Sequence, residues 1–308
     1  MAIPIVHPIG ARTALMAVAR PPLLPLLGLL GLSLIWGLSI PLTKLGLREF
    51  PPLLLATLRY VTAAPFFALF LIGRPLPSRR ALLAMIGLGV LGIGVGQVTQ
   101  ILGVQRTEAS VATIISATIP IFVVLLAGWR LRQRLRIVHG LGLALALAGV
   151  AIAVEGGGDS SSAASLSGDV LMLVSAVSIA LYYVLSAELT QHYPVITVAA
   201  WSSLAGVAVL APFVPWEIGG TEPPRLLGIG IVLYLGVLVT VAGVWVWLHT
   251  LRMLPARIAA GTQYLQPLIG VAAAAWLLGD PIGGSFGVGT VLVLVGIALS
   301  TLPRSLRQ

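Results

Sequence analysis

The chain alternates long apolar runs with short polar gaps, a pattern that predicts membrane-crossing helices. A helix needs about 20 mostly apolar residues to cross the hydrocarbon core of a bilayer, and ten stretches reach that length. Prolines and arginine clusters fill most of the gaps, as expected where helices end. The predicted helices are 23–43, 52–72, 81–102, 108–128, 137–155, 168–188, 195–214, 226–249, 257–278 and 285–302. We therefore expect an all-α polytopic membrane protein with ten transmembrane helices.

An internal duplication underlies this pattern. The stretch 88–153 recurs without a gap as 235–300, shifted by 147 residues, with 18 identities in 66 positions. So biased a composition would give roughly one identity in ten by chance. The matches include Pro120 with Pro267 and Trp129 with Trp276. A hydrophobic composition shared by the two stretches does not explain matches of these residue types. The chain is thus predicted to hold two five-helix repeats, 23–155 and 168–302, joined by a Gly- and Ser-rich linker at 156–167.

The odd number of helices in each repeat sets their relative orientation. After five crossings the second copy enters the membrane from the opposite side, so the two repeats are predicted to be inverted. Such inverted repeats are typical of secondary transporters, which alternate access around a site near the bilayer midplane. Placing the amino terminus inside puts 13 positive residues on the inner side and four on the outer side. The positive-inside rule therefore predicts cytoplasmic tails at 1–22 and 303–308.

The composition excludes several other classes of protein. Only 9% of residues are charged, 58% are hydrophobic and the mean hydropathy is +1.06, which cannot cover a soluble globule of 308 residues. The net charge of +9 is explained by membrane orientation, so we expect no nucleic-acid partner. No cysteine is present, the four histidines are scattered at helix ends, and no predicted helix carries an acid or a histidine near its middle. We therefore expect no enzyme activity, no cofactor and no metal site.

The duplication also selects candidate binding residues, because equivalent positions of inverted repeats face the same central cavity. Two equivalent pairs are polar or amphipathic: Gln100 with Trp247, and Ser116 with Gln263. Gln97 shares a helix face with Gln100 at three-residue spacing, as Gln266 does with Gln263. Amides, a hydroxyl and an indole in an apolar lining suit a substrate with an apolar body and a few hydrogen-bonding groups. The alternative is that these amides only hydrogen-bond neighbouring helices together.

Further candidates are Tyr264, Ser39, Tyr182 and Arg59. The aromatic residues either line the cavity or belong to the interfacial aromatic belt. Arg59 is the only charged residue that lies well inside a predicted helix. An ionisable residue within the membrane indicates a functional site. It is placed to hold a substrate carboxylate through a bidentate contact; the alternatives are that it extends outward to the interface or supports a loop.

Four residues are candidate hinges: Pro120, Pro267, Gly96 and Gly243. Each proline removes a backbone hydrogen bond and bends its helix, which frees the carbonyl one turn earlier. Each glycine permits close approach of a neighbouring helix. Plain packing kinks and packing surfaces are the alternative interpretation.

The order of several motifs resembles the drug/metabolite transporter superfamily, in its EamA-like group. The resemblance covers nearly the whole chain and rests on Trp36-Gly37, Lys44, Pro52, Arg59, Glu108-Ala109-Ser110, Pro120, Gly140, Gly149, Ala256, Pro267, Gly287 and Gly296. Within that group the chain is similar to bacterial inner-membrane exporters of aromatic and other neutral amino acids. One departure is that the acidic position usual in the family after the fourth helix is Gln133 here, whereas the second copy has Asp280.

Together, the repeats and the resemblance imply a secondary transporter that exports small metabolites. The resemblance implies neutral or aromatic amino acids as substrates and a bacterial-type inner membrane as the location. A drug or other metabolite exporter of the same fold, and a non-transporting membrane scaffold, are the alternatives. The expected partners are a small-molecule substrate and the lipid bilayer, and the sequence leaves the oligomeric state open.

Overall fold

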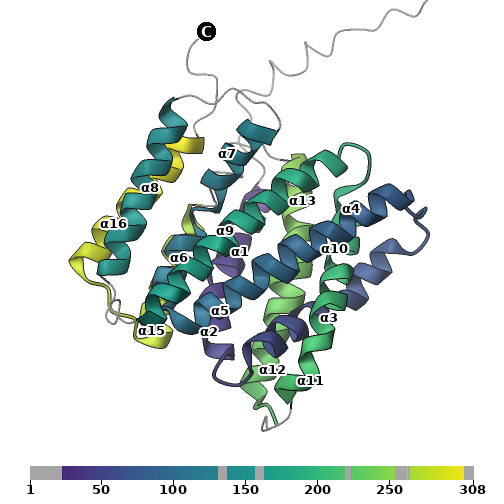
Figure 1. Cartoon of the computed structure of the whole chain (residues 1–308), viewed down its shortest axis with the longest axis horizontal. Helices are drawn as coiled ribbons and strands as arrows, with labels where there is room; N and C mark the ends of the chain where they lie inside the picture. The colour runs from purple at the N-terminus through teal and green to yellow at the C-terminus, as the bar shows by residue number, and fades with distance from the viewer. Residues whose placement is uncertain are drawn as a thin grey trace, which may run out of the picture.

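The computed structural model describes residues 23–130, 137–156, 163–218, 223–253, 262 and 264–301, and every regular element in these ranges is helical (Figure 1). Eight helical stretches are long and apolar enough to cross a membrane: Leu23–Gly46, Pro52–Leu71, Arg79–Arg106, Ala109–Arg130, Ile137–Glu155, Ala163–Leu189, Val195–Glu217 and Leu226–Trp247. Two shorter apolar helices follow, Leu265–Leu278 and Gly284–Ser300. The all-α membrane fold is confirmed. The count of ten spans stays a prediction, because the predicted start of the ninth helix lies outside the described residues.

Several spans consist of more than one helical segment. The first half contains α1 (Leu23–Gly37) and α2 (Ser39–Gly46), α3 (Pro52–Leu71), α4 (Arg79–Gly89) with the π-helix η2 (Val90–Gln97) and α5 (Val98–Arg106), α6 (Ala109–Ser116) and α7 (Ile119–Arg130), and α8 (Ile137–Glu155). The second half contains α9 (Ala163–Leu189), α10 (Val195–Leu210) with η3 (Ala211–Phe213) and α11 (Val214–Ile218), α12 (Leu226–Leu233) with the π-helix η4 (Tyr234–Ala242) and α13 (Gly243–Met253), α15 (Leu265–Leu278) and α16 (Gly284–Thr301).

Local sequence explains several of the helix ends. Proline at the first helical position and serine at an N-cap both suit a helix start, and they open α3 at Pro52 and α4 after Ser78, whose hydroxyl accepts from the amide of Ala81 (3.3 Å). Glycine ends two helices by adopting a left-handed conformation, with φ of 73° at Gly73 and 76° at Gly279.

Among the described residues, the largest difference from the predicted boundaries is at the start of the sixth predicted helix, 168–188. Helix α9 begins at Ala163, inside the predicted 156–167 linker, because Ala163, Ala164 and Leu166 are strong helix formers. As a result Asp169 lies in the second turn of α9, and it is only 7% exposed. Its carboxylate accepts a hydrogen bond from the Thr107 hydroxyl (2.7 Å). The predicted tails and Gln133 lie outside the described residues.

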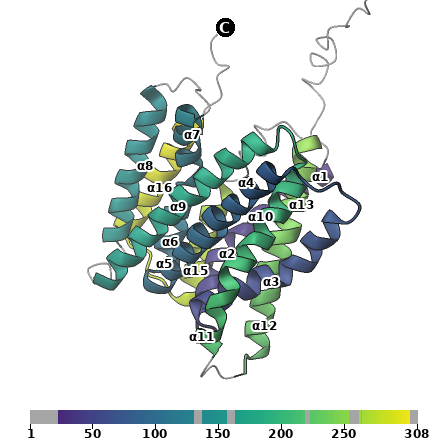
Figure 2. The same ribbon diagram turned by 45° about the vertical axis from the view of Figure 1, so that its right-hand side comes forward.

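Helices α8 and α16 pack along each other at one edge of the bundle (Figures 1 and 2). Glycines make this contact close: a Cβ at Gly142 would lie 2.6 Å from the Gly296 carbonyl oxygen, and a Cβ at Gly149 would lie 2.7 Å from that of Gly289. The earlier glycine of one helix meets the later glycine of the other, so the two helices run antiparallel. The 147-residue shift exchanges the two contacts with each other.

Other helix pairs also pack in the same way after each helix is replaced by its equivalent in the other half. Helix α3 packs on α10 and α6 packs on α15, while α5 against α9 has its counterpart in α13 against α1. The largest buried clusters contain apolar residues from both halves, for example Ile114 with Val293 and Leu55 with Leu235. The two halves therefore share one core.

Substituting Gly149→Ala tests the glycine contact between α8 and α16. The added methyl group would meet backbone atoms of α16, and overpacking of this kind costs roughly 1–3 kcal/mol. We expect a lower apparent Tm in thermal unfolding of the detergent-solubilised protein. Gly140→Ala on the same helix is the matched control, because a Cβ there meets nothing within 4 Å. Equal Tm values for the two variants would contradict the tight contact.

Candidate functional site

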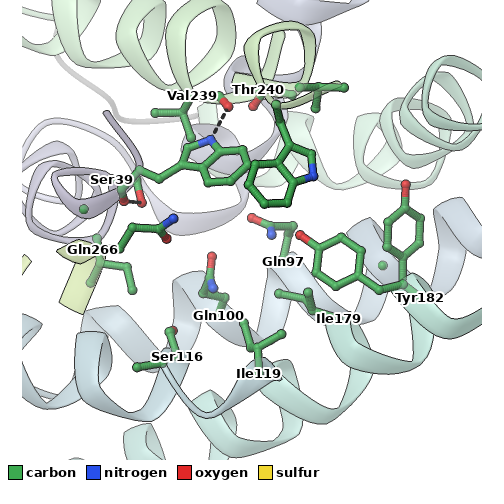
Figure 3. A pocket seen from close by; sticks show the side chains of 18 of the residues that line it. Ser39, Gln97, Gln100, Ser116, Ile119, Ile179, Tyr182, Val239, Thr240 and Gln266 are labelled. Atoms are coloured by element: carbon green, nitrogen blue, oxygen red, sulfur yellow. Dashed lines mark hydrogen bonds between the residues drawn. The ribbon is translucent and has the colours of Figure 1, made fainter. Parts of the chain in front are cut away.

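A cavity of about 550 Å³ lies between the two halves of the chain (Figure 3). Its lining comes from both halves, including α3, η2 and α6 of the first and α9, η4 and α15 of the second. In Figure 3 the side chains of Gln97, Gln100 and Gln266 point into the space in the middle of the view. The volume falls within the range usual for small-molecule sites, about 300–1,000 Å³.

Eight of the nine predicted binding residues line this cavity. They are Gln100, Ser116, Trp247, Gln97, Tyr264, Ser39, Tyr182 and Arg59. The ninth, Gln263, lies outside the described residues. Of the predicted hinges, Pro120 and Pro267 line the cavity, whereas Gly96 and Gly243 lie behind it, packed against Ile179 and Trp36. The structure brings these residues together, and their part in binding or movement stays a prediction.

Sequence reasoning missed several polar lining residues as candidates, among them Thr113 and Ser203. Two more are Thr240 and Gln266. Both have apolar equivalents under the 147-residue shift, Ile93 and Ile119, and those equivalents also line the cavity. The candidate pairs were equivalent positions at which both side chains are polar or amphipathic. Retaining pairs with one polar member would have found Thr240 and Gln266.

Two spans are interrupted beside the cavity, each a few residues before a proline. Helix α1 ends at Gly37 ahead of Pro41, and α6 ends at Ser116 ahead of Pro120. Because proline has no N–H, the carbonyls of Gly37 and Ser116 lose their usual helical donor. The interruption expected at Pro120 is present, whereas the one at Pro41 was not predicted. Both carbonyls belong to residues that line the cavity.

The π-helical segments η2 and η4 occupy overlapping positions in the two halves. The shift places 90–95 of η2 on 237–242 of η4. A π-turn changes the hydrogen-bonding register of the backbone, and such turns are frequent at functional sites. In each segment a carbonyl accepts a side-chain hydrogen bond from the other half: Val239 from Trp36 Nε1 (3.0 Å, dashed in Figure 3) and Leu91 from Ser178 Oγ (2.8 Å).

Trp36 has a second contact that reaches the cavity. Its ring lies 5.9 Å from that of Trp247, centroid to centroid, with the planes tilted by 47°. This tilted arrangement is favourable for two aromatic rings. A Cβ at position 243 would clash with Trp36 Nε1, so Gly243 is required for the indole to reach the η4 backbone. The indole pair forms an aromatic wall of the cavity.

Among the described residues that line the cavity, Arg59 is the only charged one, and no Asp or Glu is present. It lies two turns into α3. Its Nε donates to Thr240 Oγ1 (3.1 Å) and its Nη1 to Gln97 Oε1 (3.2 Å), and its Cζ lies 5.6 Å from the centroid of the Tyr60 ring. Arg59 thus contacts the last residue of η2 and a residue of η4.

Lys44 and Asp280 lie outside the cavity lining and stabilise helix ends instead. Lys44 Nζ donates to the carbonyls of Val104 (2.8 Å), Gln105 (3.0 Å) and Thr107 (2.7 Å) at the end of α5. The Asp280 carboxylate accepts from the Ser110 amide (2.8 Å) in the first turn of α6. A cation at a helix C-terminus and an anion at an N-terminus are both favourable. These two charges therefore have a structural explanation.

The sequence was compared with known protein families and relatives. A model described as the EamA-like transporter family matches residues 23–154 and 166–302. The chain belongs to the EamA-like transporter family. The resemblance stated from the motifs is confirmed, and the two matches correspond to two copies of the family unit. This protein is therefore a membrane transporter.

Relatives of similar length support the assignment. The chain is 30% identical over 271 residues to an uncharacterized transporter of Archaeoglobus fulgidus (87% of this chain, 95% of the relative). It is 28% identical over 276 residues to the uncharacterized inner membrane transporter YedA of Escherichia coli K12 (85% and 84%). It is 29% identical over 288 residues to a probable amino-acid metabolite efflux pump of Salmonella typhimurium (89% and 93%). A crystal structure with a TM-score of 0.62 and 20% identity covers 90% of the chain and 98% of its own, and shows the shared fold.

Replacing Trp36 by phenylalanine tests the hydrogen bond to η4. Phenylalanine keeps an aromatic ring but leaves the Val239 carbonyl without the indole donor, and an unpartnered buried carbonyl costs roughly 1–3 kcal/mol. We expect a lower apparent Tm in detergent for Trp36→Phe. The control is Trp129→Phe, since that indole is 75% exposed on the outer surface. If both variants lost the same stability, the bond to Val239 would have no special role.

Proposed function

We propose that this EamA-family transporter exports small metabolites, foremost neutral or aromatic amino acids, from the cytoplasm across a bacterial-type inner membrane. The observation that carries the proposal is a small-molecule-sized cavity whose lining comes from both halves of the chain. A site between two repeats is the arrangement that alternating access requires, because rocking of one repeat against the other opens it to either side in turn.

The proposed architecture is ten transmembrane helices in two inverted repeats with both termini in the cytoplasm. The antiparallel crossing of α8 and α16, two helices at equivalent places in the halves, supports the inversion. Two parallel repeats would place these helices in the same direction. The excess of positive residues in alternate gaps supports the orientation of the termini.

The chemistry of the cavity supports amino acids over cationic drugs. Apolar and aromatic side chains form most of the lining, and the polar groups are amides, hydroxyls and one guanidinium. A cationic drug would place its charge near Arg59, and the part of the lining that the structure describes holds no carboxylate to offset it. The name of the Salmonella typhimurium relative, a probable amino-acid metabolite efflux pump, agrees with this substrate class.

Counterflow of radiolabelled solutes in proteoliposomes tests the proposal. We expect flux of leucine, phenylalanine or another neutral amino acid, and a lower rate for Gln100→Ala, since the amide directed into the cavity is lost. Gln105→Ala is the matched control, because Gln105 is exposed near the end of α5, outside the lining. Flux of cationic drugs alone would indicate the drug-exporter alternative, and absence of all flux would indicate a scaffold.

The absence of acids and histidines from the described lining predicts transport without an obligatory proton gradient. We expect comparable initial rates in proteoliposomes with and without an imposed pH difference. Asp169→Asn is the informative variant, because Asp169 is a buried carboxylate outside the lining. Flux that required a pH gradient would overturn the prediction, and loss of that requirement in Asp169→Asn would identify Asp169 as the coupling carboxylate.

A further inference from the structure

The charge of Arg59 is not balanced inside the cavity. Its two hydrogen-bond acceptors, the Thr240 hydroxyl and the Gln97 amide oxygen, are both neutral. The ion pair found among the described residues joins Arg130 to Glu188 on the exposed surface and does not involve Arg59. Arginine carries five N–H donors, and these two bonds engage two of them. The guanidinium therefore keeps donors and a full positive charge available to a ligand.

A cation without a counter-ion is costly in a membrane interior, so such residues mark sites of function. Packing fixes the backbone that carries Arg59: a Cβ at Gly236 would lie 2.7 Å from the Arg59 carbonyl oxygen and would clash with the neighbouring Thr62. Helix α3 is thus held tightly against η4. The guanidinium of Arg59 is therefore carried into the cavity by a backbone held in a defined position.

We propose that Arg59 recognises the carboxylate of the substrate, and that the ligands of this cavity are small monocarboxylates with an apolar body, with or without an amino group. The inference rests on the proposed transport function and deepens it. It makes the carboxylate the required group and the amino group dispensable.

The charge count favours a carboxylate over a phosphate. One guanidinium balances one negative charge and matches the two oxygens of a carboxylate in a bidentate contact. A phosphate dianion would leave one charge unbalanced, because the described residues of the lining include no second cation. The apolar body then has a partner in the wall formed by Trp36 and Trp247.

The amino group has no comparable partner. An ammonium would find only neutral acceptors in the described lining, such as the amide of Gln100 and the carbonyl of Ser116. Hydrogen bonds to a charged group are worth roughly twice neutral ones, but an ion pair adds Coulomb attraction that neutral acceptors lack. Removing the amino group should therefore weaken binding less than removing the carboxylate charge.

The same guanidinium bonds to both π-helical segments, through Gln97 in η2 and Thr240 in η4. Thr240 Oγ1 in turn donates to the Leu235 carbonyl (2.8 Å), five residues back in the π-turn. The remaining N–H donors of Arg59 are thus available to a carboxylate while the guanidinium stays bonded to one segment of each half.

The experiment compares two sets of ligands on the purified full-length protein. The aromatic set is L-phenylalanine, L-phenylalaninamide and 3-phenylpropionate; the aliphatic set is L-leucine, L-leucinamide and 4-methylpentanoate. Binding is measured in detergent by the change in tryptophan fluorescence, since Trp36 and Trp247 lie at the cavity, and by ligand-induced thermal stabilisation. The proteins are the wild type, Arg59→Gln, Arg59→Lys and the control Arg80→Gln, in which an exposed arginine of α4 is changed.

We expect the wild type and Arg80→Gln to bind the amino acid and the acid without an amino group, and to bind the amide at least roughly tenfold more weakly. Arg59→Gln should lose this preference for the carboxylate. Arg59→Lys should keep part of it, because the charge remains but the bidentate geometry is lost. Amides that bind the wild type as tightly as acids, or carboxylates that do not bind it at all, would overturn the inference even if Arg59→Gln failed to fold.

Flux of the same ligands in proteoliposomes separates this inference from the transport proposal. Carboxylate-selective binding without flux would uphold the Arg59 site and refute transport of these solutes. Flux of neutral amino acids together with their amides, at equal rates, would uphold transport and refute the role of Arg59.

Discussion

A backbone inside a bilayer has no water to satisfy its N–H and C=O groups, and most features of this transporter follow from that constraint. Spans that remain regular helices meet it internally. Four of the spans that border the cavity do not remain regular: α1 and α6 stop ahead of prolines, and η2 and η4 change to a π register. These irregular stretches lie inside the bundle beside the cavity, where protein groups replace lipid as the neighbours.

The groups that satisfy the irregular backbone come from across the interface between the halves. The Trp36 indole bonds to η4 and the Ser178 hydroxyl bonds to η2, so each half completes the hydrogen bonding of the other. Along the far edge, α8 and α16 are joined by glycine contacts between regular helices. The cavity lies at the interface that these side-chain hydrogen bonds cross.

The helical spans, their interruption at Pro120 and most of the cavity residues were predictable, because the lengths of the apolar runs, the positions of the prolines and the internal repeat can be read directly from the sequence. Gln100 and Trp247 were found at the cavity by their equivalence alone. The π segments were not predicted, because glycine-rich apolar stretches such as Val90–Gln97 suit regular and π-helices equally. The start of α9 was misplaced because it depends on helix propensity in a stretch that reads as a linker. Thr240 was missed because its equivalent, Ile93, is apolar.

The mismatches between the halves determine what an otherwise two-fold cavity can distinguish. Counted from the N-cap prolines, Pro51 and Pro194, the eighth residue is Arg59 in α3 and Ser202 in α10. The acceptors of Arg59 are equally one-sided, since Gln97 corresponds to Val244 and Thr240 to Ile93. A symmetric lining would present the same groups to both ends of a substrate, whereas an amino acid has unlike ends. Confining the cation and its acceptors to single copies gives the cavity a polarity that matches such a molecule, while the repeated backbone retains the geometry that alternating access requires.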